Sequence, residues 1–229
     1  MISSQSEVHI DHLIRSKRRT MSLEINKDGS LTVRAPRRAA DGEISAFVNS
    51  KKDWIIKKQF QADQRAREAP PKQFVEGEQF LYLGISYPME IVNRQAVPLV
   101  LNGKFTLRAE SPVISIQVFE KWYREQAVKI IKPRTDTLAK NNGFEYTIIR
   151  INGAKTHWGS CGPKGSLNFP WRLVMAPEEV IDYVIVHELV HLRVRNHSRR
   201  YWQAVKGIMP DYKTRLKWLQ ENGHRLSLD

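Results

Sequence analysis

The residues whose types and spacing point most clearly to a chemical reaction are His187, Glu188 and His191, in the sequence His-Glu-Leu-Val-His. On a helix, two histidines four positions apart point the same way one turn apart, so both imidazoles can reach one ion. Glu188 follows the first histidine and would lie beside that ion, where it can take a proton from bound water. The pattern therefore predicts metal-assisted hydrolysis.

The flanking residues favour a buried helix around this motif. Pro177 suits a first helical turn, and Glu178 and Glu179 follow where the positive helix end favours acids. Residues 180–186 are mostly apolar, so the helix and its histidines should be buried. The alternative is a helix with two hydrogen-bonded core histidines. Two buried imidazoles and a buried glutamate are costly without a shared partner, which favours the metal site.

A zinc site that keeps a place for water needs a third protein ligand, and His197 is the leading candidate. The spacing of His187, His191 and His197 is the one that metzincins use, in which a glycine lets the chain turn before the last histidine. This chain has Val194 at that position. The alternative for His197 is an ordinary histidine of a surface loop.

The chain must bend before His197, because an unbroken helix would turn that residue about 120° away from the preceding histidine. Asn196 tolerates left-handed backbone geometry and is the expected bend. Ser198 is a good cap for a following helix over residues 199–208. We therefore expect His197 in an elbow between two helices.

Residues 157–168 form a second informative stretch, which predicts two short strands around a Gly-Pro-Lys-Gly turn. A strand edge beside the metal helix could hold an extended peptide by backbone pairing, so Trp158, Gly159 and Ser160 are candidate substrate-binding residues. Cys161 follows His157 by four residues and could suggest a thiol nucleophile. Nothing in the sequence marks this thiol as activated, and the metal site explains more.

The elements that must position these residues begin with short strands. A strand is expected to start at residues 8–10, and the alternation over 21–25 and 31–35 predicts a hairpin. Helical spacing covers residues 41–60, and the polar stretch 57–72, with its Pro70-Pro71 break, is expected to be a connector. Residues 80–108 return to strands, with a break at Gly84 and a tight hairpin turn at Asn102-Gly103.

A long helix is expected from Ser111-Pro112 to about Asn141-Asn142-Gly143, with Pro133 kinking or splitting it. Residues 145–151 are strand-like. This order is not a regular βαβ alternation, so the expected fold class is α+β. We expect a β-rich N-terminal region with a helix, residues 1–110, followed by a domain built around the metal helix, residues 111–229.

Composition sets further limits. The chain has 229 residues, 41% of them hydrophobic, which suits a folded core. No run of eighteen apolar residues and no leader pattern is visible, so we expect no membrane partner. A single cysteine excludes an internal disulfide and suggests the cytoplasm. The net charge of +13 is spread along the chain; it indicates either a solvated basic surface or nonspecific nucleic-acid contact.

The motifs together closely resemble the YgjP-like metal-dependent hydrolases, relatives of the SprT and WLM zincins. The resemblance rests on the segments 157–161, 167–168, 182–192, 196–198 and 201–202, and on N-terminal matches at 15–25, 28–29, 33–36, 47 and 54–55. It implies a zincin-like domain over residues 111–229. It also implies one zinc ion, or another divalent metal, held by His187, His191 and His197, with Glu188 as general base and acid. His157 departs from the family, which usually has an arginine there.

Three functions remain open at this point. The first is a metallopeptidase that acts on a peptide or protein through metal-activated water and Glu188. The second keeps the metal but cleaves a phosphoanhydride of a nucleoside triphosphate, as a pyrophosphatase would, which the positive charge suits. The third is a non-catalytic, nucleic-acid-associated module in which zinc is structural.

Overall fold

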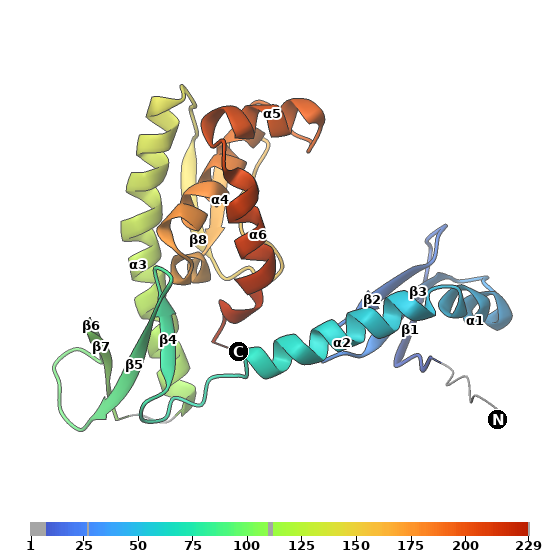
Figure 1. Cartoon of the computed structure of the whole chain (residues 1–229), viewed down its shortest axis with the longest axis horizontal. Coiled ribbons are helices and arrows are strands. Elements are labelled where there is room, and N and C mark those ends of the chain that lie inside the picture. The colour runs from blue at the N-terminus through green and yellow to red at the C-terminus, as the bar shows by residue number, and fades with distance from the viewer. Residues whose placement is uncertain (1–7, 27, 110–111, 229) are drawn as a thin grey trace. The chain divides into compact units, whose positions relative to one another are not determined.

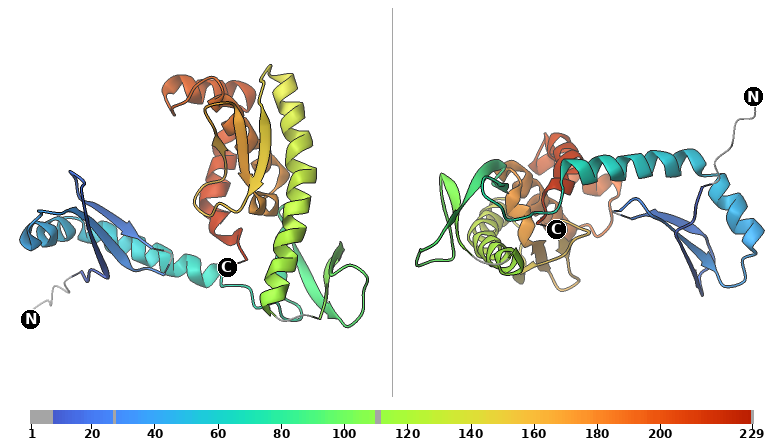
Figure 2. Two further views of the ribbon diagram at one scale, coloured as in Figure 1. Left: turned by 180° about the vertical axis from the view of Figure 1, so that it is seen from behind. Right: turned by 90° about the horizontal axis from the view of Figure 1, so that it is seen from below.

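A computed structural model of the chain describes residues 8–26, 28–109 and 112–228. The chain divides into two compact units, Met1–Pro70 and Pro71–Asp229. Figures 1 and 2 show the elements of both units, and each unit is described by itself. The Pro70-Pro71 break therefore coincides with the division between the units.

The first unit is a three-stranded sheet covered by helices. Its elements are β1 (His12–Ser16), β2 (Ser22–Ile25), β3 (Leu31–Pro36), α1 (Asp41–Asn49) and α2 (Lys52–Glu68). The strand order is β1-β3-β2, with β1 parallel and β2 antiparallel to β3. Alternate residues of β3 are fully buried and pack against both helices; the core residues are Leu31, Val33, Ala35, Ile44, Val48 and Ile55.

The hairpin expected from the alternating residues is confirmed as β2 and β3. Two other expectations for this unit are wrong. The first strand begins at His12 and not at residues 8–10. The expected helix is two helices, and α2 continues to Glu68 through the stretch expected to be a connector. That stretch consists mainly of Lys, Gln, Ala, Arg and Glu, whose high helix propensity outweighs their lack of apolar periodicity.

The second unit begins with a four-stranded sheet of order β4-β5-β7-β6. Its strands are β4 (Gln79–Tyr82), β5 (Ile85–Val92), β6 (Leu99–Asn102) and β7 (Lys104–Arg108). The expected tight turn at Asn102-Gly103 is confirmed, with Gly103 at φ 69°. Leu83 and Gly84 join β4 to β5 with positive φ angles of 49° and 79°. This turn reaches the start of the metal helix, because a Cβ on Gly84 would lie 2.7 Å from Cγ of Pro177.

A long helix and a small sheet form the next layer. They are α3 (Pro112–Asn141), β8 (Ile148–Asn152), β9 (Ser160–Cys161), β10 (Ser166–Pro170) and the 3-10 helix η1 (Trp171–Met175). The sheet order is β8-β10-β9, so β9 is an edge strand. The two strands expected around the Gly-Pro-Lys-Gly turn are therefore confirmed as β9 and β10. In Figure 1, α3 runs alongside this sheet.

Of the two effects expected of Pro133, a kink or a split, the split does not occur, because α3 continues from Pro112 to Asn141. Proline removes one helical hydrogen bond and leaves the carbonyl four residues earlier, at Lys129, without its partner. Both residues are exposed, so water can bind that carbonyl. The expected helix end is confirmed, since α3 stops at Asn141 and Gly143 has a left-handed φ of 64°.

The last elements are α4 (Glu178–His191), α5 (Arg199–Ile208), α6 (Tyr212–Asn222) and the 3-10 helix η2 (Gly223–Arg225). Helix α4 lies between α3 and α6, and α5 also packs on it. Nine of its residues are buried, which its continuous apolar run predicted. The HELVH motif is thus placed at the C-terminal end of a core helix.

The described residues form six α-helices and three small sheets, so the expected α+β class is confirmed. The expected boundary after residue 110 and the expected cap Ser111 fall at residues 110–111, outside the described residues. Strands β4 to β7 belong to the second compact unit.

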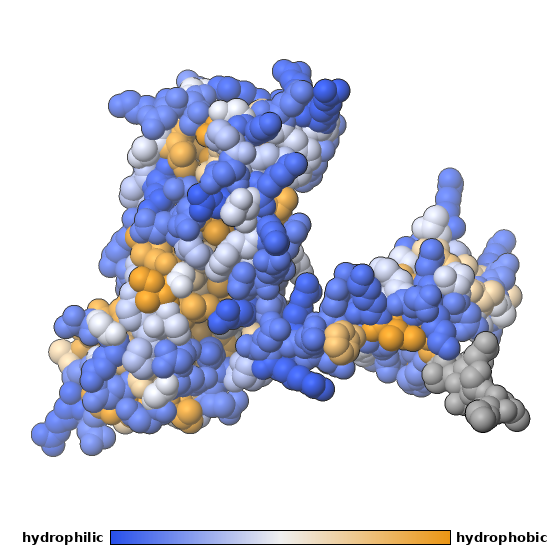
Figure 3. Space-filling model, in the orientation of Figure 1, coloured by the Kyte–Doolittle hydropathy of each residue, from blue (hydrophilic) through white to orange (hydrophobic). Residues whose placement is uncertain are grey.

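None of the described helices is both long and apolar enough to span a bilayer. Figure 3 shows apolar patches over α2 and α3 on a mostly hydrophilic face.

Candidate metal centre and its cleft

Helix α4 is fixed at its N-terminal end by ion pairs to two neighbouring helices. Arg134 of α3 donates to Asp182 at 2.8 Å and also to Glu178. Arg215 of α6 lies 3.4 Å from Glu179. Pro177 was expected in the first turn but is the N-cap, so the helix begins one residue later, at Glu178; the carbonyl of Pro177 accepts the first helical hydrogen bonds. These contacts hold the helix that carries the first two histidines.

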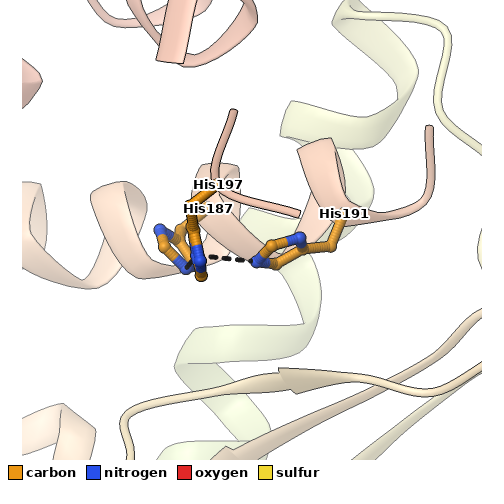
Figure 4. A group of neighbouring side chains, drawn as sticks. All are labelled: His187, His191 and His197. Carbon is orange, nitrogen blue, oxygen red and sulfur yellow. Dashed lines mark hydrogen bonds between the residues drawn. The ribbon is translucent and has the colours of Figure 1, made fainter. Parts of the chain in front are cut away.

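The structure brings the Nε2 atoms of three histidines to one point, as Figure 4 shows. His187 and His191 come from α4, and His197 from the segment before α5. The Nε2 atom of His197 lies 3.1 Å from that of His187 and 3.1 Å from that of His191. Tetrahedral zinc with bonds of ~2.0–2.1 Å would hold its nitrogens about 3.4 Å apart. The three atoms therefore stand near the spacing of ligands to one ion.

The protonation of these rings suits metal binding. Burial, with smaller contributions from His191 and His197, lowers the pKa of His187 to about 3. Burial also lowers the pKa of His191. The Nδ1 atom of His191 lies 3.1 Å from the carbonyl oxygen of Val194, so Nδ1 donates and Nε2 keeps its lone pair. Neutral imidazoles with free lone pairs are the form that binds a metal.

The donor set fits a divalent cation. Nε2 lone pairs that converge within hydrogen-bond distance repel one another unless an electrophile lies between them. A proton on His197 could bridge only one of its two contacts at a time. All three donors are nitrogen atoms, which favours zinc over magnesium or calcium. The described residues contain no second group of three or more such metal-binding side chains. The residues present are therefore suited to hold one zinc ion.

The segment that delivers His197 makes its turn without a glycine. Helix α4 ends with the amides of Leu192, Arg193 and Val194 bonded to carbonyls of its last turn. Asn196 lies at a bend, as expected, but positive φ is absent there. Ser198 occupies the expected N-cap of α5, although its side chain makes no cap hydrogen bond. The bend expected at Asn196 is thus confirmed, although its backbone is not left-handed, and other contacts must hold this segment.

Two arginines supply those contacts. Arg193 donates to the carbonyls of Asn142 at 3.2 Å and Gly143 at 2.5 Å, just after the C-terminal end of α3. Arg195 donates to the carbonyls of Gly162 and Pro163, both at 3.0 Å, in the turn between β9 and β10. The segment that carries the third histidine is therefore anchored on two sides. Sequence reasoning missed this anchoring, because the acceptors are backbone carbonyls 30 to 50 residues away.

Tyr201 packs against the three histidines, a supporting role that sequence reasoning did not assign to it. Its hydroxyl donates to the carbonyl of His187 at 2.9 Å, and its side chain is fully buried. Its ring centroid lies 4.6 Å from that of His191 and 4.8 Å from that of His197. Tyr201 therefore fixes α5 against the metal helix. The sequence signals were its place in the first turn of the helix that follows Ser198 and its inclusion, with Trp202, in the family resemblance.

Glu188 is almost entirely buried and faces the cleft. Burial raises the pKa of its carboxyl to about 8. The side chain lies against Gly159, where a Cβ atom would come within 2.5 Å of Oε1 of Glu188. Only glycine leaves room for the carboxyl group at this place. Gly159 was predicted to bind substrate, and the structure gives it this additional role.

The three histidines and Glu188 open into a cleft of about 540 Å³. Trp158, Gly159 and Ser160 line this cleft, and their role in binding substrate stays a prediction. Ser160 is part of edge strand β9, and its Oγ accepts from Asn168 at 3.1 Å. Trp158 packs under the guanidinium of Arg172, 4.8 Å from the ring centroid. The apolar end of the cleft is formed by Val184, Leu216 and Leu219.

Cys161 and His157 also line the cleft. Burial raises the pKa of the Cys161 thiol, which is the opposite of activation. The Nδ1 atom of His157 lies 3.2 Å from Oγ1 of Thr156. Neither residue belongs to the group of converging metal donors. The structure therefore gives no support to a thiol nucleophile.

Tyr183 is a further polar side chain beside the motif. It lines the cleft with its ring 6.0 Å from that of His187. Burial raises the pKa of its hydroxyl to about 12, so it keeps its proton at neutral pH. Tyr201 already donates to a backbone carbonyl, and Arg193 faces Gly143 outside the cleft.

Comparison with known proteins gives one match over most of the chain. A profile of the family described as "YgjP-like, metallopeptidase domain" matches residues 19–222. Among solved structures, the metallopeptidase zymogens abylysin of Pyrococcus abyssi and jannalysin of Methanocaldococcus jannaschii are similar, at 19% and 22% identity. Each alignment covers 40% of this chain and 93% or 89% of the other, with TM-scores of 0.37 and 0.36. A search of curated proteins found no significant match.

Proposed function

The chain belongs to the YgjP-like metallopeptidase family, and from that premise we propose that it hydrolyses peptide bonds at the centre formed by His187, His191 and His197. The observation that carries this proposal is the convergence of the three Nε2 atoms beside the buried carboxyl of Glu188. Three histidine ligands leave one coordination place of a tetrahedral zinc ion open. When bound, zinc supplies a Lewis acid that acidifies water and polarises a carbonyl.

Glu188 is the general base of the proposed reaction. Its carboxylate accepts a proton from the water that attacks the substrate carbonyl, and then donates that proton to the leaving nitrogen. Its raised pKa, about 8, suits the second of these steps, because the protonated form is stable at neutral pH. A cation held by the histidines would favour the carboxylate form for the first step. The absence of a side chain at Gly159 leaves room for this carboxyl group.

The substrate is proposed to be a peptide held in extended form along β9. This strand pairs with β10 on one side only, so its other edge offers backbone groups for pairing. Trp158, Gly159 and Ser160 would contact the peptide there. Tyr183, which lines the cleft, would donate to the carbonyl oxygen as negative charge develops on it.

The experiment compares wild type with Glu188→Gln. Both proteins are loaded with zinc and incubated with peptides, unfolded protein and nucleoside triphosphates, while new amino groups, phosphate and pyrophosphate are measured. We expect peptide cleavage by the wild type, and a variant that retains zinc but cleaves at least ~10²-fold more slowly. Release of pyrophosphate or phosphate without peptide cleavage would favour the nucleotide alternative, which no contact of the cleft supports specifically. Salt-sensitive nucleic-acid binding with no turnover would favour the zinc-module alternative.

A further inference from the structure

A second groove of about 540 Å³ lies next to the metal centre, on the far side of the ring of Trp202. It is lined by Arg199, Trp202, Gln203 and Lys206 of α5, by Pro210, and by Tyr212 and Lys213 of α6. Trp202, Gln203 and Lys206 follow Arg199 by three, four and seven positions, so they lie on the same side of α5 as Arg199. The groove is thus built from one helix face and the start of the next helix.

The aromatic floor connects this groove to the candidate metal centre. The ring of Trp202 stacks on His197 at 5.7 Å with an interplanar angle of 26°. The same ring stacks on Tyr212 at 5.4 Å with an angle of 18°. His197 of the metal centre and Tyr212 of the groove therefore both contact the ring of Trp202. An extended peptide spans ~10 Å in about three residues, so a chain bound at the metal centre can reach the groove.

The charge of the groove is one-sided. Arg199, Lys206 and Lys213 are exposed, and none of them has an ion pair or a side-chain hydrogen bond among the described residues. No carboxylate lines the groove. The nearest acid in sequence, Asp211, accepts from Arg215 at 2.6 Å. Three cations without counter-ions around a concave surface attract anionic groups strongly.

We propose that this groove is an exosite for acidic side chains of the peptide substrate, about three residues from the scissile bond. The inference rests on the proposed peptidase function and adds a substrate class to it, namely peptides with Asp or Glu at that distance. A peptide segment suits the position better than a separate ligand, because Trp202 forms the floor of the groove and also contacts a residue of the metal centre. The aromatic rings hold the apolar stem of the acidic residue while the cations bind its carboxylate.

The test uses two peptides that differ only in Glu against Gln, placed three residues from a cleavage site mapped in an unfolded protein. The Glu peptide should be cleaved with a roughly five- to tenfold higher kcat/KM, mainly through a lower KM, because the contact is equal in ground and transition states. The advantage should shrink at 1 M salt. Binding of dye-labelled peptides to the Glu188→Gln protein should show the same preference without turnover.

Two double variants with equal charge change locate the effect, and a third with reversed charge tests its sign. Lys206→Gln/Lys213→Gln should bring the Glu-to-Gln ratio close to one. Lys206→Glu/Lys213→Glu should bring that ratio below one. Lys121→Gln/Lys129→Gln, on exposed positions of α3, should retain the ratio of the wild type. Cleavage of both peptides with equal efficiency by the wild type would overturn the exosite and leave the peptidase intact. Cleavage of neither peptide would overturn the peptidase itself. Loss of oligonucleotide binding in the Lys206/Lys213 variant, with no change in peptide preference, would assign the groove to nucleic acid.

Discussion

Removing the charge of Glu188 should stabilise the metal-free protein, and the gain should grow with pH. Burial raises the pKa of this carboxyl from 4.5 to about 8. The folded chain therefore keeps a proton that the unfolded chain releases near pH 4.5. The stability from this tighter proton binding is fully present below pH 4.5 and is lost as pH rises to about 8. Glutamine has the same shape and no charge, so Glu188→Gln escapes this loss.

The size of the effect follows from the shift in pKa. One unit corresponds to about 1.4 kcal/mol, so a shift from 4.5 to about 8 sets an upper limit of roughly 5 kcal/mol. Because Glu188 lines an open cleft, water reduces this cost, and we expect roughly 2–4 kcal/mol. This amount is large beside the ~5–15 kcal/mol by which a typical domain is stable.

The assay is urea unfolding of chelator-treated protein at pH 5 and pH 9, followed by circular dichroism. The free energy of unfolding of Glu188→Gln should exceed that of wild type by ~2–4 kcal/mol more at pH 9 than at pH 5. Glu125→Gln makes the same chemical change at an exposed position of α3 and should show no such difference. A gain of equal size at both pH values would refute the reasoning. The buried carboxyl ionises only at high pH, so its cost must be larger at pH 9 than at pH 5.

Three further predictions concern the support of the centre. Gly159→Ala should lower kcat/KM at least about tenfold with little change in melting temperature, since the new methyl group displaces the flexible Glu188 carboxylate and not the backbone. Arg195→Met should weaken zinc binding about tenfold in competition with a chelator, and unchanged affinity would contradict its anchoring role. Tyr201→Phe should cost ~1–2 kcal/mol in urea unfolding, because the carbonyl of His187 loses a buried donor.

Elements with strong local signals could be predicted from the sequence. The hairpin of β2 and β3, the Asn102-Gly103 turn and the end of α3 at Gly143 each depend on a few neighbouring residues. The parallel pairing of β1 with β3 could not be predicted, because it joins residues about twenty positions apart without a local marker. Helix α2 was misjudged for the opposite reason. Its sequence has high helix propensity but little apolar periodicity.

The candidate site divides in the same way. The placement of His187 and His191 follows from helical spacing alone, and the approach of His197 follows from that spacing plus a required bend. The residues that hold the site are invisible to local rules. Gly159 touches Glu188 across 29 positions, and Arg193 reaches Gly143 across 50. Such contacts appear only when the sheet, α3 and α4 are packed together.

The centre gathers groups that are each unfavourable in a metal-free core. The Nδ1 atom of His187 is buried without a hydrogen-bond partner, the Nε2 atoms of three neutral imidazoles face one another, and Glu188 resists ionisation. One divalent cation relieves the last two of these costs, because it accepts the lone pairs and attracts the carboxylate. Ion pairs at the start of α4 and arginine anchors beyond its end hold the groups in place meanwhile. The stability lost at the centre is therefore offset by the packing around it, an arrangement common at sites where function and stability conflict.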